Sequence, residues 1–182
     1  MKLWVPLLGL LVSMPVLGEI SFAQLSQLVD NPQQHQGRFQ QEKYISSVDA
    51  SLASSGEFAY RRGESIRWHI QQPIETELLL TPAGISSNGQ SGLLLQLEGN
   101  DNPVAKVMGE FLFALLTSDW NALSVLFELS GEVSAERWQA TLVPRDGSLA
   151  QVFDRIEISG AGLLEKVVMH ESSGDRTTIM LD

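Results

Sequence analysis

The sequence predicts an α+β fold in which a single curved antiparallel β-sheet forms a half-open barrel covered by a few α-helices. Three observations support this prediction. Segments with alternating apolar and polar residues recur along the chain and are separated by turn-forming residues, as is typical of antiparallel strands. One long segment after Pro103 has helical spacing instead. The chain contains no cysteine, so its stability is expected to come from a hydrophobic core rather than from disulfide bonds.

Residues 1–18 have the features of a secretory signal peptide. Lys2 supplies an early positive charge, and a long apolar run ends in small residues suited to cleavage. A buried N-terminal helix is the alternative, but Pro6 and Pro15 disfavour it. No cysteine follows the run, so the lipid anchor of a lipoprotein is not expected. Residues 19–182 then form one soluble, exported domain, with the periplasm favoured over an extracellular location.

The first half of the exported chain predicts a short helix followed by several strands. A helix is predicted over residues 21–30, with Ser21 as its cap and Phe22, Leu25 and Leu28 on one face. Strands are predicted at residues 38–44, 57–61, 65–71 and 76–81, with a short strand or loop at 85–90. Residues 46–55 are small and polar with weak strand character, and residues 92–97 are apolar.

The second half begins with the clearest helix in the sequence. Pro103 suits a first helical turn, and an apolar stripe that includes Phe111 and Leu115 continues to Leu116. Residues 119–127 are predicted as a second helix or a loop. Strands are predicted at residues 137–144, 153–159, 163–170 and 176–181, separated by turns at hairpin-like spacing.

Charge and motif searches disfavour several classes of function. The net charge of −10, which becomes more negative when Lys2 is removed, argues against binding to nucleic acid. The chain has no metalloprotease motif and no nucleophile elbow. His69 is interpreted as an outward residue of a strand, and His170 with Glu171 could bind a metal only if further ligands converged from elsewhere. We therefore predict no enzymatic activity, no metal and no cofactor.

The apolar residues are the more informative group. Several tryptophans, seven phenylalanines and a leucine-rich middle have to be placed in one modest domain. An ordinary packed core is one explanation. The other is a strongly curved sheet wrapped over a helix, which can leave an interior larger than its own side chains fill.

The order of several short segments resembles the LolA family of periplasmic carriers, which move lipoproteins from the inner to the outer membrane. The matching segments are GRFQQEK at 37–43, GEFAYRR at 56–62, IRW at 66–68, Gln72-Pro73, WQATLVP at 138–144, Phe153 with 156–159, and GDRT at 174–177. The resemblance covers most of residues 19–182. It implies an open barrel-like sheet, covered by helices, with an apolar cavity that shelters acyl chains.

The resemblance also implies roles for individual residues. The cavity lining is expected to be drawn from Phe58, Tyr60, Ile66, Trp68, Leu78, Leu80, Leu95, Phe111, Leu115, Trp138 and Leu142. Arg62 matches an arginine that, in such carriers, donates hydrogen bonds to a helical lid; the alternative is a solvated turn residue. Two departures stand out, because Gly63 replaces the usual proline and the sequence stops at Asp182 without the usual tail. A specialised relative carrying another lipid is therefore considered too.

The expected partners follow from the same resemblance. They are a lipoprotein or lipid cargo, a donor protein in the inner membrane and an acceptor in the outer membrane, with the carrier itself a monomer. The alternative function is a non-catalytic accessory or structural protein of the cell envelope that docks a membrane complex. A lipid hydrolase would need a nucleophile beside a base, and the sequence offers no such set.

Overall fold

The computed structural model describes residues 20–81, 84–88, 103–134, 137–145 and 147–182. The predicted signal peptide at residues 1–18, the apolar segment 92–97 and the predicted lining residue Leu95 lie outside these ranges.

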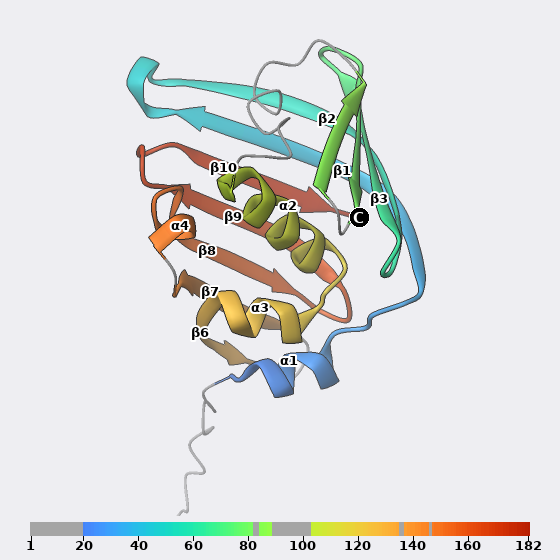
Figure 1. Ribbon diagram of the computed structural model, residues 1–182, viewed down its shortest axis with the longest axis vertical. Helices are drawn as coiled ribbons and strands as arrows, with labels where there is room; N and C mark the ends of the chain where they lie inside the picture. Colours follow the sequence, from blue (N-terminus) through green and yellow to red (C-terminus); the bar gives the residue numbers. More distant parts are fainter. Residues whose placement is uncertain (1–19, 82–83, 89–102, 135–136, 146) are drawn as a thin grey trace, which may run out of the picture.

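Ten strands of the described chain form one antiparallel sheet, in the order β5-β4-β3-β2-β1-β10-β9-β8-β7-β6 (Figure 1). The strands are β1 (Gln34–Ile45), β2 (Ala50–Arg61), β3 (Ser65–Gln72), β4 (Thr76–Thr81), β5 (Gly84–Asn88), β6 (Phe127–Val133), β7 (Trp138–Pro144), β8 (Phe153–Gly160), β9 (Leu164–Glu171) and β10 (Arg176–Leu181). The described strands β5 and β6 end the sheet and do not pair with each other, so the sheet is curved but open. The predicted α+β class and half-open sheet are confirmed.

Four α-helices lie on one face of this sheet (Figure 1). They are α1 (Phe22–Leu28), α2 (Pro103–Leu116), α3 (Trp120–Leu126) and the single turn α4 (Gly147–Ala150). Ser21 caps α1 as predicted, because its side chain accepts a bond from the Gln24 backbone N–H and the Gln24 side chain accepts from the Ser21 N–H. The helix ends at Leu28, two residues before the predicted end.

The structure differs from the predicted element order in the starts of two strands and in two further elements. Strand β1 begins at Gln34 and β2 at Ala50, both well before the predicted starts. Strand β6 was not predicted, and α4 replaces part of a predicted turn. The polar and small residues that extend β1 and β2 pair with each other, so a partner strand rather than hydrophobic alternation makes them extended.

Alternation within β2, β3 and β4 places their apolar side chains on the helix-covered, inner face. Two rows cross these strands, with Phe58, Trp68 and Leu78 in one and Tyr60, Ile66 and Leu80 in the other. All six side chains are buried. The residues between them, such as Glu57 and Arg67, point to the outer face and are exposed. The inner face of these strands is therefore an apolar wall.

The two halves of the chain meet at a single ladder in the middle of the sheet. Strands β1 to β5 follow one another in space as in sequence, and so do β6 to β10. The halves are joined by antiparallel pairing of β1 with β10, from Phe39 opposite Leu181 to Tyr44 opposite Arg176. One continuous sheet thus supports both the apolar wall and the helix-covered half.

Candidate functional site

Stacked aromatic rings form the centre of the apolar wall. The rings of Phe39 and Trp68 stack with their centroids 3.9 Å apart, and Phe58 stacks beside Trp68 at 5.9 Å. His35 closes one end of the group, 5.4 Å from the Phe58 ring and 5.8 Å from the Tyr60 ring. Rings in such offset arrangements attract one another beyond simple area burial. The sheet thus presents a broad aromatic surface to the helices.

Helix α2 brings a second apolar surface against the other half of the sheet. Phe111 lies 5.2 Å from the ring of Phe127 and 5.6 Å from that of Phe153, and it is fully buried. Leu115, one turn further along α2, is buried as well. The helix also contacts β4 and β5. Helix α2 therefore spans from the far half of the sheet towards the aromatic wall.

Ten of the eleven residues predicted to line a cavity are described, and no side chain among them is more than 6 % exposed. The structure brings six of them together on β2, β3 and β4, namely Phe58, Tyr60, Ile66, Trp68, Leu78 and Leu80. Phe111 and Leu115 lie on α2, whereas Trp138 and Leu142 lie on β7 in the other half of the sheet. The predicted set thus lies in one hydrophobic interior but on three separate surfaces.

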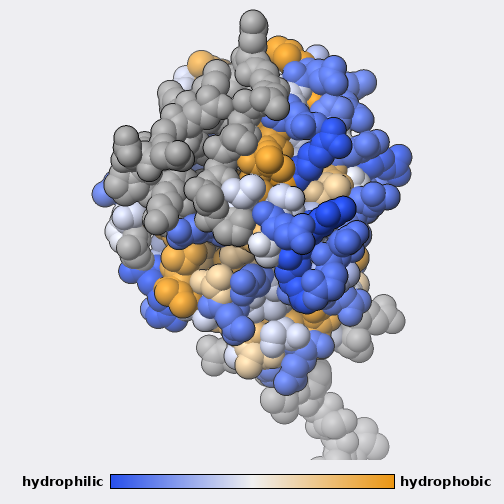
Figure 2. All heavy atoms as spheres, turned by 45° about the vertical axis from the view of Figure 1, so that its right-hand side comes forward, coloured by the Kyte–Doolittle hydropathy of each residue, from blue (hydrophilic) through white to orange (hydrophobic). Residues whose placement is uncertain are grey.

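The hollows lined by described residues lie mainly on the outer face of the sheet. One of about 460 Å³ lies beside Glu57, Arg67 and His69, and another of about 430 Å³ lies over β7, β8 and β9. Their lining is polar or charged for the most part. Figure 2 shows the side of β3 to β5 as a mainly hydrophilic surface with scattered hydrophobic atoms. In the described chain, these hollows are distinct from the apolar interior between sheet and helices.

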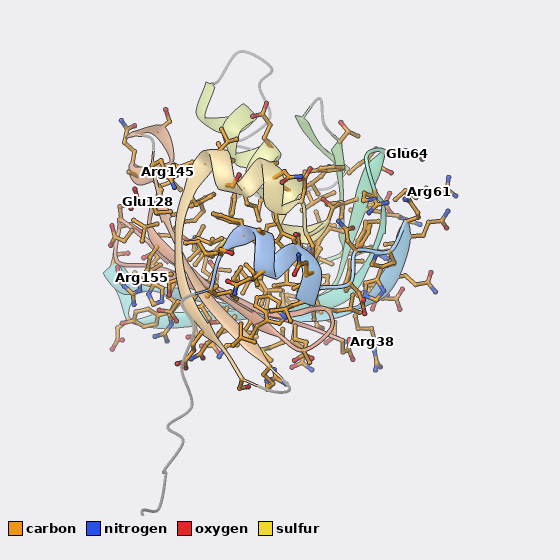
Figure 3. The ribbon with its side chains drawn as sticks, turned by 90° about the horizontal axis from the view of Figure 1, so that it is seen from below. Arg38, Arg61, Glu64, Glu128, Arg145 and Arg155 are labelled. Carbon is orange, nitrogen blue, oxygen red and sulfur yellow. The ribbon has the colours of Figure 1, made fainter. Side chains whose placement is uncertain are left out.

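Arg62 links the turn after β2 to the segment that follows α1. Its Nη1 donates to the main-chain oxygen of Asn31 at 3.0 Å, and its own backbone N–H donates to the oxygen of Gln33. The neighbouring Arg61 points outwards and pairs with Glu64 of the same turn, at 3.8 Å (Figure 3). Within the described residues, the two consecutive arginines therefore differ, because the Arg62 side chain bonds to another element and the Arg61 side chain pairs within its own turn.

Asn31 continues this link to the junction of α2 and α3. Its side-chain Nδ2 donates to the main-chain oxygen of Ser118 at 3.2 Å, and the same oxygen accepts a hydrogen bond from the backbone N–H of Trp120. Ser118 has a positive φ of 50°, which allows the chain to turn sharply between the two helices. Sequence reasoning identified Arg62 but missed Asn31, because an Asn-Pro pair mainly signals a helix stop.

A polar corner interrupts the apolar inner face near the β1–β2 hairpin. Lys43 donates to both carboxylate oxygens of Glu171, at 2.9 and 3.2 Å, and Thr177 donates to the same carboxylate. The two charged side chains are only 12 % and 20 % exposed. Next to them, the backbone N–H and hydroxyl of Ser46 donate to Asp175 and lower the pKa of its carboxyl group. The contact between Lys43 and Glu171 was not predicted from the sequence.

Among the described residues, the titratable groups near the aromatic wall do not form a catalytic arrangement. Burial raises the pKa of Tyr60, and the charge of Arg62 partly opposes this rise. His69 contacts Glu75 at 3.0 Å on the outer face, as its predicted outward position requires. His170 lies 3.1 Å from Glu157. Across the described ranges, His, Asp and Glu side chains form no group of three that could hold a metal ion.

No helix within these ranges is both long and apolar enough to cross a membrane.

Comparisons with known proteins add to this picture. The profile of the family described as "Outer membrane lipoprotein carrier protein LolA" matches residues 30–182. A protein of Pseudomonas entomophila (strain L48), named outer-membrane lipoprotein carrier protein, is 26 % identical over 184 residues, covering 95 % of this chain and 84 % of that protein.

Two solved structures are similar to the chain over most of its length. A LolA superfamily protein from Nitrosomonas europaea matches with a TM-score of 0.45 at 8 % identity, covering 88 % of this chain and 89 % of that one. A DUF1329 family protein from Desulfovibrio piger matches with a TM-score of 0.42 at 11 % identity, with 88 % of both chains covered.

Proposed function

Because this chain belongs to the LolA family of outer membrane lipoprotein carrier proteins, we propose that it shelters the acyl chains of a lipoprotein or another lipid in its apolar interior and carries them through the periplasm towards the outer membrane. The observation that carries the proposal is the aromatic wall on the inner face of β2, β3 and β4, which faces the helices. The partners are an inner-membrane donor and an outer-membrane acceptor, and the carrier acts without covalent chemistry.

The energetics explain why such a carrier needs an apolar interior. Each methylene removed from water contributes about 0.8 kcal/mol, so one long acyl chain represents roughly 10 kcal/mol. Free cargo would aggregate or return to the membrane it left. An interior of aliphatic and aromatic side chains lowers this cost. It must also release the cargo, so its affinity has to stay moderate.

The packed interior corresponds to the closed, empty carrier in this proposal. Phe39, Phe58 and Trp68 stack on one another, so an acyl chain has to separate these side chains or move the helices away from them. The cargo then competes with contacts that the protein makes with itself. This competition keeps binding reversible, because the energy of re-forming the closed interior favours release.

Arg62 is proposed to hold the cover closed. Its bond to the main chain of Asn31 ties the β2–β3 turn to the segment after α1, and the Asn31 side chain ties that segment to the α2–α3 junction. Opening the interior by moving these helices breaks at least one of these bonds. A guanidinium group suits this role, because it keeps its charge at every relevant pH and offers several donors.

Acyl-chain binding can be tested directly with a fluorescent fatty acid. The protein should raise the emission of the probe, and added phospholipid should displace it. Mass spectrometry of the natively purified protein should then identify the bound lipid. The proposal fails if the folded protein neither binds the probe nor carries lipid after native purification.

The observed packing also favours a second function, that of an accessory protein which docks an envelope complex. The described apolar side chains between the sheet and the helices are buried, while hollows lined by described residues lie on the outer face. This function requires no movement of the interior. A Trp68→Ala variant separates the two proposals, because it should change the affinity for the acyl probe in a carrier and leave docking to an outer-face partner intact.

A further inference from the structure

The β1–β2 hairpin leaves one part of the sheet without a neighbouring strand. Pairing of β2 with β3 begins at Ser55, opposite Gln72, whereas β2 itself begins at Ala50. The stretch Ala50–Ser54, here called the open edge, pairs with β1 on one side and with no described strand on the other. Figure 1 shows this hairpin extending beyond β3. Backbone groups along such an edge are available to bond an added strand.

The open edge lacks charge and proline, two of the features that commonly protect strand edges. Its sequence, Ala-Ser-Leu-Ala-Ser, contains no charged residue and no proline. Strand β6, at one end of the sheet, is different: it carries Glu128 and Glu132, and the backbone N–H of Ile20 donates to its Gly131 oxygen. The edge formed by β6 thus carries charged residues and is bonded by Ile20. Within the described chain, the open edge carries no charge and no segment covers it.

The surroundings of the open edge provide room for the side chains of an added strand. Leu52 is 60 % exposed and points to the inner face. On the outer face, a hollow of about 670 Å³ runs beside the open edge, and its lining includes Ala53, Pro73 and the half-exposed Met180. An extended segment places successive side chains on opposite faces, so it would meet Leu52 with one set and this hollow with the other.

The negative charge of the molecule indicates which kind of segment would add to the open edge. The chain has a net charge of −10, and Glu42 and Asp49 lie on the same hairpin as the open edge. The Lys43 charge is neutralised by Glu171, while Arg176 lies over the Tyr44 ring. A second copy of this chain would bring an equal negative charge, which disfavours pairing between two open edges. A cationic segment is attracted instead.

We propose that the open edge of β2 accepts an extended, cationic segment of a partner protein as an added β-strand. Backbone hydrogen bonds supply most of the affinity, so binding tolerates different sequences with the right charge and extended form. The contact lies outside the apolar interior and involves none of the residues proposed to bind acyl chains. This proposal can therefore be tested independently of the carrier function.

The test uses a blocked synthetic peptide of alternating Val and Thr with a lysine at each end. Hydrogen exchange of the full chain is measured with and without this peptide, and the peptide should slow exchange at residues 50–54. A peptide with glutamate in place of lysine should bind at least about tenfold more weakly at low salt and approach the lysine peptide as salt is raised. An Ala53→Lys variant should weaken binding of the lysine peptide by about tenfold, through repulsion at the edge.

The matched control is Val143→Lys, which adds the same charge to an exposed position of β7, a strand with neighbours on both sides. This variant should bind the peptide like the unaltered protein. Absence of protection at residues 50–54, equal binding of both peptides at low salt, or equal losses in the two lysine variants would each overturn the proposal. Protection of the same amides by the protein alone, rising with its concentration, would identify a second copy as the occupant and also overturn it.

Discussion

The Nη1 atom of Arg62 lies 3.0 Å from the main-chain oxygen of Asn31, and the side chain of Asn31 in turn bonds Ser118. Three segments that are distant in sequence are thereby tied together: the β2–β3 turn, the segment after α1 and the α2–α3 junction. Because the acceptor is a backbone oxygen, substitution of the Asn31 side chain would leave the Arg62 bond in place. The Arg62 side chain is thus the simplest point at which to break the link.

Arg62→Leu should leave folding near normal and speed the release of a bound acyl probe. The bond to Asn31 is exposed, so its loss should cost no more than about 1 kcal/mol of unfolding free energy. The measurement is the rate of probe transfer to lipid vesicles. Arg61→Leu is the control, because it removes the same charge and the Arg61 side chain, among the described residues, pairs with Glu64 of its own turn. Equal transfer rates in both variants would remove the gating role of Arg62.

Gly63→Ala should destabilise the protein by about 1 kcal/mol, although a methyl group at this position meets no atom within 4 Å. The cause is the backbone, since Gly63 has a φ of 76° that a side chain disfavours. Gly147→Ala also meets open space, lacks a positive φ and should be neutral or stabilising. Urea unfolding of both variants gives the comparison. Proline cannot adopt this φ, so Gly63→Pro should cost more than Gly63→Ala.

Leu142→Ala should lower the free energy of unfolding by about 2–5 kcal/mol, because Leu142 is fully buried and its removal leaves a cavity. The adjacent Val143 points to the outer face and is 42 % exposed. Val143→Ala should therefore change the stability by no more than about 0.5 kcal/mol. Chemical denaturation measures both. Similar losses in the two variants would contradict the assigned alternation of β7.

Glu171→Gln should destabilise the protein by about 1–3 kcal/mol, because it leaves the mostly buried Lys43 ammonium without its counter-charge. Replacing both residues, as Lys43→Met with Glu171→Leu, should restore much of that loss, since neither charge then remains to be desolvated. Thermal unfolding of the single and double variants tests this expectation. A double variant that is less stable than Glu171→Gln would show that the pair contributes net stability.

The stability of the protein should fall in acid partly through Asp175. Hydrogen bonds from Ser46 lower the pKa of this carboxyl group below its usual 3.8. The stabilisation is therefore complete above pH 3.8 and disappears as the pH falls through the lower folded-state pKa. Asp175→Ala should reduce the melting temperature at neutral pH, and its difference from the unaltered protein should shrink as the pH falls. A difference that stays constant down to about pH 2 would contradict this linkage.

Local signals predicted most of the fold. The capping role of Ser21, the helix from Pro103 to Leu116 and the strand at 76–81 depend on neighbours in sequence, and all three are observed. The inward positions of Phe58 and Trp68 follow from two-residue alternation. What the sequence could not show depends on distant partners.

Strand β6 is the clearest example of a feature missed for this reason. Its central Ser130 and Gly131 look like a break, and only pairing with β7 and the contact from Ile20 make them part of a strand. The acceptor for Arg62 and the Lys43–Glu171 pair were missed likewise, because each joins positions far apart in the chain.

The ladder between β1 and β10 suggests how the protein could be divided into two fragments that reassociate. It holds together two meanders that are each sequential in the chain, β1 to β5 and β6 to β10. A protein cut between β5 and α2 would give two fragments, each retaining all of its own hairpins. Mixed in solution, they would rejoin into one sheet through the edge from Phe39 to Tyr44, and the contacts of α2 with β4 and β5 and of Asn31 with Ser118 would add to that pairing.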